Sequence, residues 1–144
     1  MKTQHLLQKQ AGVALLEVLI AIVVMALGII GSVGLQAKAT AAMSDAGARA
    51  EAVIASEKLI GLMWNDQQNL ASYAWAGSGT APSSLAGWVT ETRASLPNAT
   101  MNITVTPQAA GSTANQVGIT IRWQRRSTDP VSNHTLTATL ATTS

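Results

Sequence analysis

Residues 10–35 read QAGVALLEVLIAIVVMALGIIGSVGL, and this stretch decides how the rest of the chain is organised. From Val18 to Leu35 no residue is charged, and the run falls in the range of about 17–25 residues at which an apolar helix crosses a bilayer. Glu17 stands at the start of the run. An isolated carboxylate at membrane depth costs about 2.5–3.5 kcal/mol, so we expect Glu17 to have a cationic partner.

A cationic partner for Glu17 arises if the chain is cut between Gly12 and Val13. The new α-amino group at Val13 then lies about one helical turn from the carboxylate of Glu17, and the pair can form within one chain or between neighbouring chains. The stretch resembles the type III signal of type IV prepilins. The residues that carry this resemblance follow a short basic leader and are Gly12, Val13, Leu16, Glu17 and Val18.

The resemblance implies a role for three positions. In the family a dedicated prepilin peptidase cuts after the glycine, here Gly12, so that Val13 becomes the first residue. The new N-terminus at Val13 is N-methylated, and the glutamate at the fifth mature position, here Glu17, guides assembly. The chain departs from the family at Val13, where phenylalanine is usual, but cleavage depends more on the glycine.

An ordinary secretory signal is the alternative interpretation of the N-terminus. Ala37, Lys38 and Ala39 have the small-x-small form of a signal-peptidase site after an apolar stretch. A cut there would release a periplasmic binding domain that starts at Thr40. We favour the prepilin interpretation because the apolar run is long for such a signal and Glu17 has no use in one. The first residue of the mature protein distinguishes the prepilin interpretation from the secretory-signal interpretation.

Composition limits what the remainder of the chain can be. The 144 residues leave room for one small domain beyond the apolar segment. The chain has no cysteine, which excludes disulfides, thiol catalysis and cysteine metal sites. Many pilins close a C-terminal loop with a disulfide, so its absence points away from a typical major pilin. Two of the nine Lys and Arg lie in the leader, which leaves seven against seven Asp and Glu, and this balance does not imply a polyanionic partner.

The helical pattern continues beyond the apolar run and predicts one helix from Val13 to about Trp64. Residues 36–64 lack proline and repeat apolar side chains at helical spacing. Asp45 and Arg49 are spaced for an i,i+4 ion pair. The apolar stripe expected to face the rest of the domain consists of Ala46, Ala50, Val53, Ile60 and Trp64.

Three glycines, Gly28, Gly31 and Gly34, recur within the apolar run. Since glycine costs up to about 1 kcal/mol in a helix, they mark either close helix packing or a zone where the helix loosens. The resemblance implies loosening as subunits enter a fibre. Membrane helices also tolerate glycine without any special role.

Residues 65–84 are rich in turn-forming residues and are expected to form a loop, with Tyr73 and Trp75 as packing anchors. A short helix is predicted from Ser84 to Leu96, with Ser84 as its cap and Pro97 after its end. The face of this helix expected to be buried consists of Leu85, Trp88, Val89, Thr92 and Leu96.

Three segments with alternating apolar and polar residues follow and predict antiparallel strands covered on one face. Their apolar positions are Met101, Ile103 and Val105, then Val117, Ile119, Ile121 and Trp123, then Leu136, Ala138 and Leu140. We therefore predict an α+β fold in which a long N-terminal helix packs on a small antiparallel sheet. The expected parts are a leader (1–12), a transmembrane helix (13–35) and a globular pilin-like domain (36–144), with a loop region at 65–98 and the sheet at 99–144.

The chain as a whole resembles the PilV type of minor pilin, through GIIGSVGL at 28–35 and the short helix that ends at Leu96-Pro97-Asn98. This resemblance implies a structural and assembly subunit of a type IV pilus, not an enzyme, without a cofactor. The implied partners are major and minor pilins, prepilin peptidase, the inner-membrane assembly platform and membrane lipid. The implied location is the inner membrane, with a periplasmic domain, and then the pilus fibre. A pseudopilin of a type II secretion system shares these features and stays an alternative.

The sequence contains no evident arrangement of catalytic or metal-binding residues. His134 is the one histidine of the mature chain, and no metal-binding set can be built around it. The serines lack a G-x-S-x-G elbow. Arg122, Arg125 and Arg126 could contact the phosphates of DNA, although a solvated turn is the simpler explanation.

Overall fold

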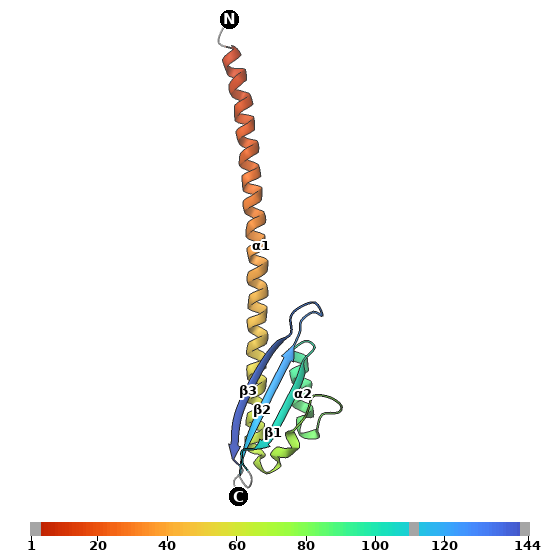
Figure 1. The fold of residues 1–144 in the computed structure, drawn as a ribbon. Coiled ribbons are helices and arrows are strands. Elements are labelled where there is room, and N and C mark those ends of the chain that lie inside the picture. Colours follow the sequence, from red (N-terminus) through yellow and green to blue (C-terminus); the bar gives the residue numbers. More distant parts are fainter. Residues whose placement is uncertain (1–3, 110–112, 142–144) are drawn as a thin grey trace. The chain divides into compact units, whose positions relative to one another are not determined.

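The fold consists of one long helix followed by two short helices and a three-stranded sheet (Figure 1). The computed structural model describes residues 4–109 and 113–141, with side chains from residue 13 onward. The elements are α1 (Gln4–Asn65), the 3₁₀ helix η1 (Gln67–Tyr73), α2 (Ser83–Ser95), β1 (Thr100–Pro107), β2 (Ala114–Trp123) and β3 (Ser132–Ala141). This arrangement confirms the predicted α+β fold.

The chain divides into two compact units, Met1–Ser44 and Asp45–Ser144, and their boundary falls within α1. The helix ends at Asn65, next to the predicted end at Trp64. In the uncut chain it begins at Gln4, so it contains the whole helix predicted from Val13 and extends into the predicted leader. No proline interrupts the predicted leader, and its backbone therefore continues the helix. Residues 1–3 of that leader lie outside the described residues.

In the first unit, the large apolar side chains from Val13 to Leu35 are all 54–71% exposed. Among the described residues, α1 is the one helix long and apolar enough to cross a membrane. A helix that is apolar on every side and has nothing packed on it needs a nonaqueous environment supplied from outside the chain.

In the second unit, the strands form an antiparallel meander in the order β1-β2-β3. Ile103 on β1 pairs with Ile119 on β2, which pairs with Leu136 on β3. The predicted alternation is confirmed, and the inner face buries Met101, Ile103, Val117, Ile119, Ile121, Trp123 and Leu140. The core also contains residues of α1 and α2, so the sheet is covered by helices on one face.

The stripe of α1 that packs in this core differs from the predicted one. The side chains fully buried on α1 are Ala52, Ser56, Leu59 and Met63, while Ala46, Ala50 and Trp64 of the predicted stripe are exposed and Val53 and Ile60 are half-buried. The buried stripe lies one residue earlier, about 100° around the helix. Helix α2 contacts α1 next to this stripe, where the indole Nε1 of Trp88 donates to the carbonyl oxygen of Ala55 at 2.8 Å.

The segment predicted as a loop between the helices is partly regular. Residues 67–73 form η1, and Trp75 pairs with Ile103 of β1 through hydrogen bonds of 2.9 and 2.8 Å. Tyr73 and Trp75 are buried, which confirms them as packing anchors. The hydroxyl of Tyr73 donates to the carboxylate of Asp66 at 3.0 Å, so a polar contact holds η1 in place.

Helix α2 buries the predicted face but is not capped as predicted. It begins at Ser83, after Pro82, without a side-chain cap. The hydroxyl of Ser84 instead donates to the carbonyl oxygen of Ser72 at 3.3 Å, which joins α2 to η1. The helix ends at Ser95, before Pro97, as predicted.

Candidate functional site

The predicted cleavage point lies within helical backbone. Gly12 and Val13 both belong to α1, and side chains are described from Val13 onward. Val13 is exposed. Four residues separate it from Glu17, which places the two positions about 40° apart around the helix and about 6 Å apart along it. An amine at Val13 and the carboxylate of Glu17 therefore lie on the same side of α1.

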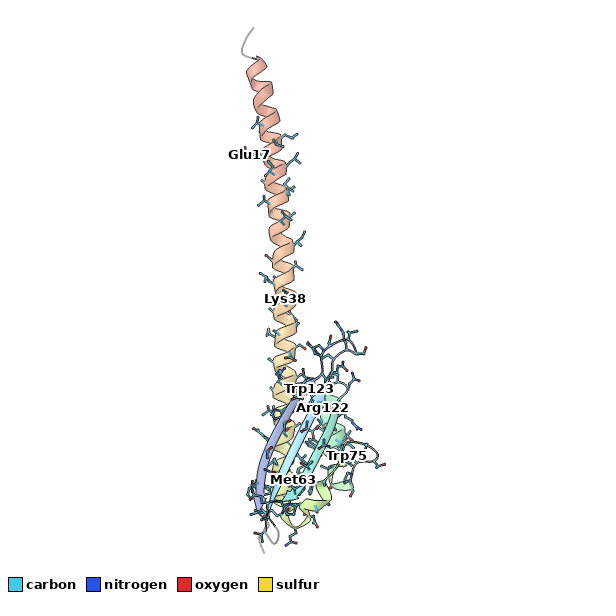
Figure 2. All side chains as sticks on the ribbon, viewed as in Figure 1. Glu17, Lys38, Met63, Trp75, Arg122 and Trp123 are labelled. Atoms are coloured by element: carbon cyan, nitrogen blue, oxygen red, sulfur yellow. The ribbon has the colours of Figure 1, made fainter. Side chains whose placement is uncertain are left out.

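Glu17 is an acid on an apolar helix surface (Figure 2). Neither of the ion pairs Arg49–Asp45 and Lys58–Glu91 involves Glu17. Large apolar side chains flank it, including Leu16 and Val18. The carboxylate is thus left to find its counter-charge outside the described part of this chain.

The helix face that carries Glu17 also carries several small side chains of the apolar segment. Residues spaced alternately by four and three positions share this face, within a sector of about 80°. We call it the Glu17 face, and it consists of Glu17, Ala21, Val24, Gly28, Gly31 and Leu35. Leu, Ile and Val occupy most of the remaining surface. Such a face permits close approach of a second helix.

Two of the three predicted glycines belong to the Glu17 face, and Gly34 lies to one side of it. Nothing lies within 4 Å of a Cβ added at Gly28 or Gly31, so packing within the chain does not require glycine there. The hydroxyl of Ser32 donates to the carbonyl oxygen of Gly28 at 3.0 Å, which satisfies it inside the helix. The backbone across these glycines is continuous α-helix.

A charge-free interval separates Glu17 from Lys38. The twenty residues between them carry no charge, and the helical rise from Glu17 to Lys38 is about 31 Å. The hydrocarbon core of a bilayer is about 30 Å thick. The two charges thus bracket one membrane thickness (Figure 2).

The structure places the three predicted arginines on two different elements. Arg122 lies on the outer face of β2, opposite Thr100 and Asn133, and lines an open pocket with Gly77. Arg125 and Arg126 belong to the loop between β2 and β3. His134 is half-buried on β3 opposite Ile121, and its Nε2 is buried without a hydrogen-bond partner among the described residues.

Sequence reasoning missed two features of these surfaces. The Glu17 face could have been found by projecting residues 17–35 onto a helix, because the spacing is regular. The residues that surround the β2–β3 loop could not have been found by such a projection. The loop brings Arg125 and Asp129 to one open pocket with Asp45 and Arg49 of α1, and this contact depends on how the sheet packs.

The sequence family described as the prokaryotic N-terminal methylation motif matches residues 7–33. The matched stretch contains the predicted cleavage point and Glu17. It supports a type IV pilin-like prepilin, a class whose known members are structural subunits and associate with other pilins. With the apolar helix, it also indicates anchoring in the inner membrane. Comparisons with curated proteins and with solved structures found no match.

Proposed function

We propose that this protein is a minor pilin of the PilV type, a structural and assembly subunit of a type IV pilus. Prepilin peptidase cuts the precursor after Gly12, and Val13 becomes the N-methylated first residue. The mature chain waits in the inner membrane with its second unit in the periplasm and then joins major and minor pilins at the assembly platform. The observation that carries this proposal is a carboxylate that has no partner among the described side chains and lies on a face of an apolar helix with Ala21, Gly28 and Gly31.

The membrane stage is supported by the spacing of charges on α1. With Lys38 at the periplasmic edge of the hydrocarbon core, Glu17 lies at the cytoplasmic edge, since the rise between them is about 31 Å. At the edge the carboxylate reaches water and headgroups, and its desolvation cost is much lower than at the centre. The precursor is therefore stable in the bilayer before any partner arrives.

In the fibre, Glu17 sets the register between neighbouring helices. Movement of an apolar helix from lipid into a bundle of like helices exchanges one apolar environment for another, so apolar contact alone does not set the register. Inside the bundle Glu17 loses water and needs a cation. The methylated amine at Val13 of a neighbouring subunit supplies it, and the small Glu17 face lets that neighbour approach.

The minor role is supported by what the second unit lacks. The chain has no cysteine, so the C-terminal disulfide of many major pilins is absent. The described sheet has three strands, on a domain with a small core.

N-terminal sequencing of the protein isolated from its host tests the processing step. We expect the mature chain to start at Val13 with a methylated amine. A start at Thr40 would instead identify a domain released by ordinary signal peptidase and would overturn the proposal.

Recovery of the subunit in sheared pili tests the assembly step. Glu17→Gln removes the charge at nearly constant size, so we expect normal insertion and cleavage but a large loss from the fibre fraction. The matched control is Glu57→Gln, since Glu57 is an exposed acid of the second unit. Equal recovery of both variants would refute the pairing role. A secretion defect without a pilus defect after deletion would assign the chain to a type II secretion system.

A further inference from the structure

The loop between β2 and β3, residues 124–131, gathers basic side chains at one end of the second unit. That unit is neutral overall, with six Lys and Arg and six Asp and Glu. The charges at this end are Arg49, Arg122, Arg125, Arg126, Asp45 and Asp129, an excess of two positive charges. Glu51 and Glu91 line a separate pocket with Lys58, between α1 and α2. The β2–β3 loop itself carries Arg125 and Arg126 against one acid, Asp129.

The loop lies beside the point at which α1 enters the second unit. Asp45 and Arg49, the first charged residues of that unit, line one open pocket of about 290 Å³ with Arg125, Asp129 and Pro130. Figure 1 shows the loop between β2 and β3 extending beyond the strands at this end. The β2–β3 loop thus lies at the end of the second unit where α1 enters it.

The loop is held from its base and presents its tip to solvent. The side-chain Nε2 of Gln124 donates to the carbonyl oxygens of Asp129 at 2.6 Å and Ser127 at 3.2 Å. The backbone N–H of Asp129 donates to the carbonyl oxygen of Arg126 at 3.0 Å. Arg126 is exposed, and so is Val131, an apolar side chain with no polar role. The arginines are carried on an ordered turn.

The chain between the membrane edge and the second unit is short. With Lys38 at the edge of the hydrocarbon core, Asp45 follows after seven residues, which span about 10 Å as a helix. The headgroup layer takes up about 5–8 Å of that distance. The remaining distance is shorter than the Debye length at physiological salt, roughly 8 Å, so an anionic surface attracts exposed arginines across it.

We propose that the β2–β3 loop binds the anionic headgroups of the bilayer in which the chain is anchored, and that this contact holds the second unit at the membrane surface before assembly. The proposal rests on the proposed function, since it needs the apolar segment to span a membrane. Two or three arginines bind a free polyanion weakly. The tether raises the effective concentration of the membrane, so the same few charges suffice there. This favours lipid over DNA as the partner.

The test uses the full chain in lipid nanodiscs. Because the chain has no cysteine, Ser127→Cys allows one fluorescent label at the loop tip. Discs of phosphatidylcholine, alone or with about one third phosphatidylglycerol, carry a headgroup-bound quencher. We expect quenching to increase at least about twofold with the anionic lipid and to return to the neutral-lipid level at high salt.

The increase in quenching with anionic lipid should disappear when Arg125→Gln and Arg126→Gln are added to the labelled Ser127→Cys chain. The control combines Gln68→Glu with Thr106→Glu, at two exposed positions outside this end of the unit. It changes the net charge by the same amount as the arginine variant. We expect the control to keep the increase in quenching with anionic lipid. Equal quenching in both lipids, or an unchanged response of the arginine variant, would overturn the proposal. So would saturable binding of duplex DNA without a lipid effect, which would reassign the loop to DNA.

A second label separates failure of this proposal from failure of the proposed function. Leu27→Cys places a label in the middle of the apolar segment. Quenching by lipids with a quencher in the acyl chain would verify that the segment spans the bilayer, whatever the loop does. No quenching at this position would overturn the membrane anchoring and, with it, the loop proposal.

Discussion

The part of α1 in the first unit and the part in the second unit differ in whether their apolar side chains are buried by the rest of the chain. In the first unit the large apolar side chains from Val13 to Leu35 are more than half exposed, whereas in the second unit Leu59 and Met63 are fully buried by α2 and the sheet. One continuous helix therefore combines a segment whose apolar side chains are buried by its own chain with a segment whose apolar side chains require lipid or other helices. Mutations that respect this division should have separable effects on stability and on assembly.

The largest difference is expected between two Leu to Ala substitutions. Leu59→Ala leaves a cavity in the core and should lower the free energy of unfolding by about 2–5 kcal/mol. Leu27→Ala, in the first unit, should leave it unchanged. Urea unfolding of the full chain in detergent, followed by tryptophan fluorescence, measures this, because all four tryptophans lie in the second unit. A comparable loss from Leu27→Ala would break the division.

Substitutions of one glycine in each unit, Gly77 and Gly28, test the same difference between the units. Gly77 has φ +82°, and an added Cβ would lie 2.1 Å from the carbonyl oxygen of Met101. Gly77→Ala should therefore destabilise the second unit by about 1–3 kcal/mol. Gly28→Leu meets nothing in its own chain, so the same unfolding measurement should not change, while recovery in sheared pili should fall. Normal recovery would show that the Glu17 face does not pack against a neighbour.

The polar groups of the two units differ in the same way. Tyr73 donates to Asp66 within the second unit, whereas Glu17 has no described partner. Tyr73→Phe should cost about 0.5–1.5 kcal/mol, measured by urea unfolding. Ser127→Ala, at an exposed position of the β2–β3 loop, serves as a control for fold integrity.

Tyr73 also predicts how stability depends on pH. Burial, and then the hydrogen bond and charge of Asp66, raise the pKa of Tyr73 above its ordinary value of 10.0. The native state keeps this proton at a pH where the unfolded state has lost it, so the contribution is present below about pH 10 and falls as the pH rises above that value. Tyr73 is the one tyrosine, so its ultraviolet titration is unambiguous. A pKa at or below 10.0 would contradict the burial.

The smallest effect is expected at the start of the second unit. Arg49 and Asp45 form an ion pair of 2.9 Å, but both side chains are substantially exposed. Asp45→Asn should cost about 0.3–0.5 kcal/mol, and the difference should disappear at high salt. A loss above 1 kcal/mol would mean that this pair, and the pocket beside it, contribute to the core.

Several features of the fold could be predicted from local periodicity in the sequence. The three strands, the buried face of α2 from Leu85 to Leu96 and the end of α1 follow from spacing alone. The apolar run and Glu17 likewise indicate the N-terminal signal that the family match supports. Cleavage at Gly12, methylation at Val13 and the assembly role of Glu17 stay predictions.

Features that depend on packing between distant segments were beyond the sequence. The wrong stripe on α1 illustrates this: Ala46 to Trp64 and Ala52 to Met63 are both apolar at helical spacing, and only the sheet selects between them. Ser84 was mistaken for a cap because its contact with Ser72 needs η1 to be in place. The bridge from Trp75 to Ile103 is equally nonlocal.

The meander has a consequence for biosynthesis. Leu59 on α1 and Leu140 on β3 are buried in one core, yet the ribosome adds Leu140 about 80 residues later, roughly 4–16 s at ordinary translation speeds. Throughout that interval the buried stripe of α1 exists without the strand that later covers it. Folding of the second unit must therefore finish after β3 has been synthesised, and chaperones have those seconds in which to bind the exposed stripe.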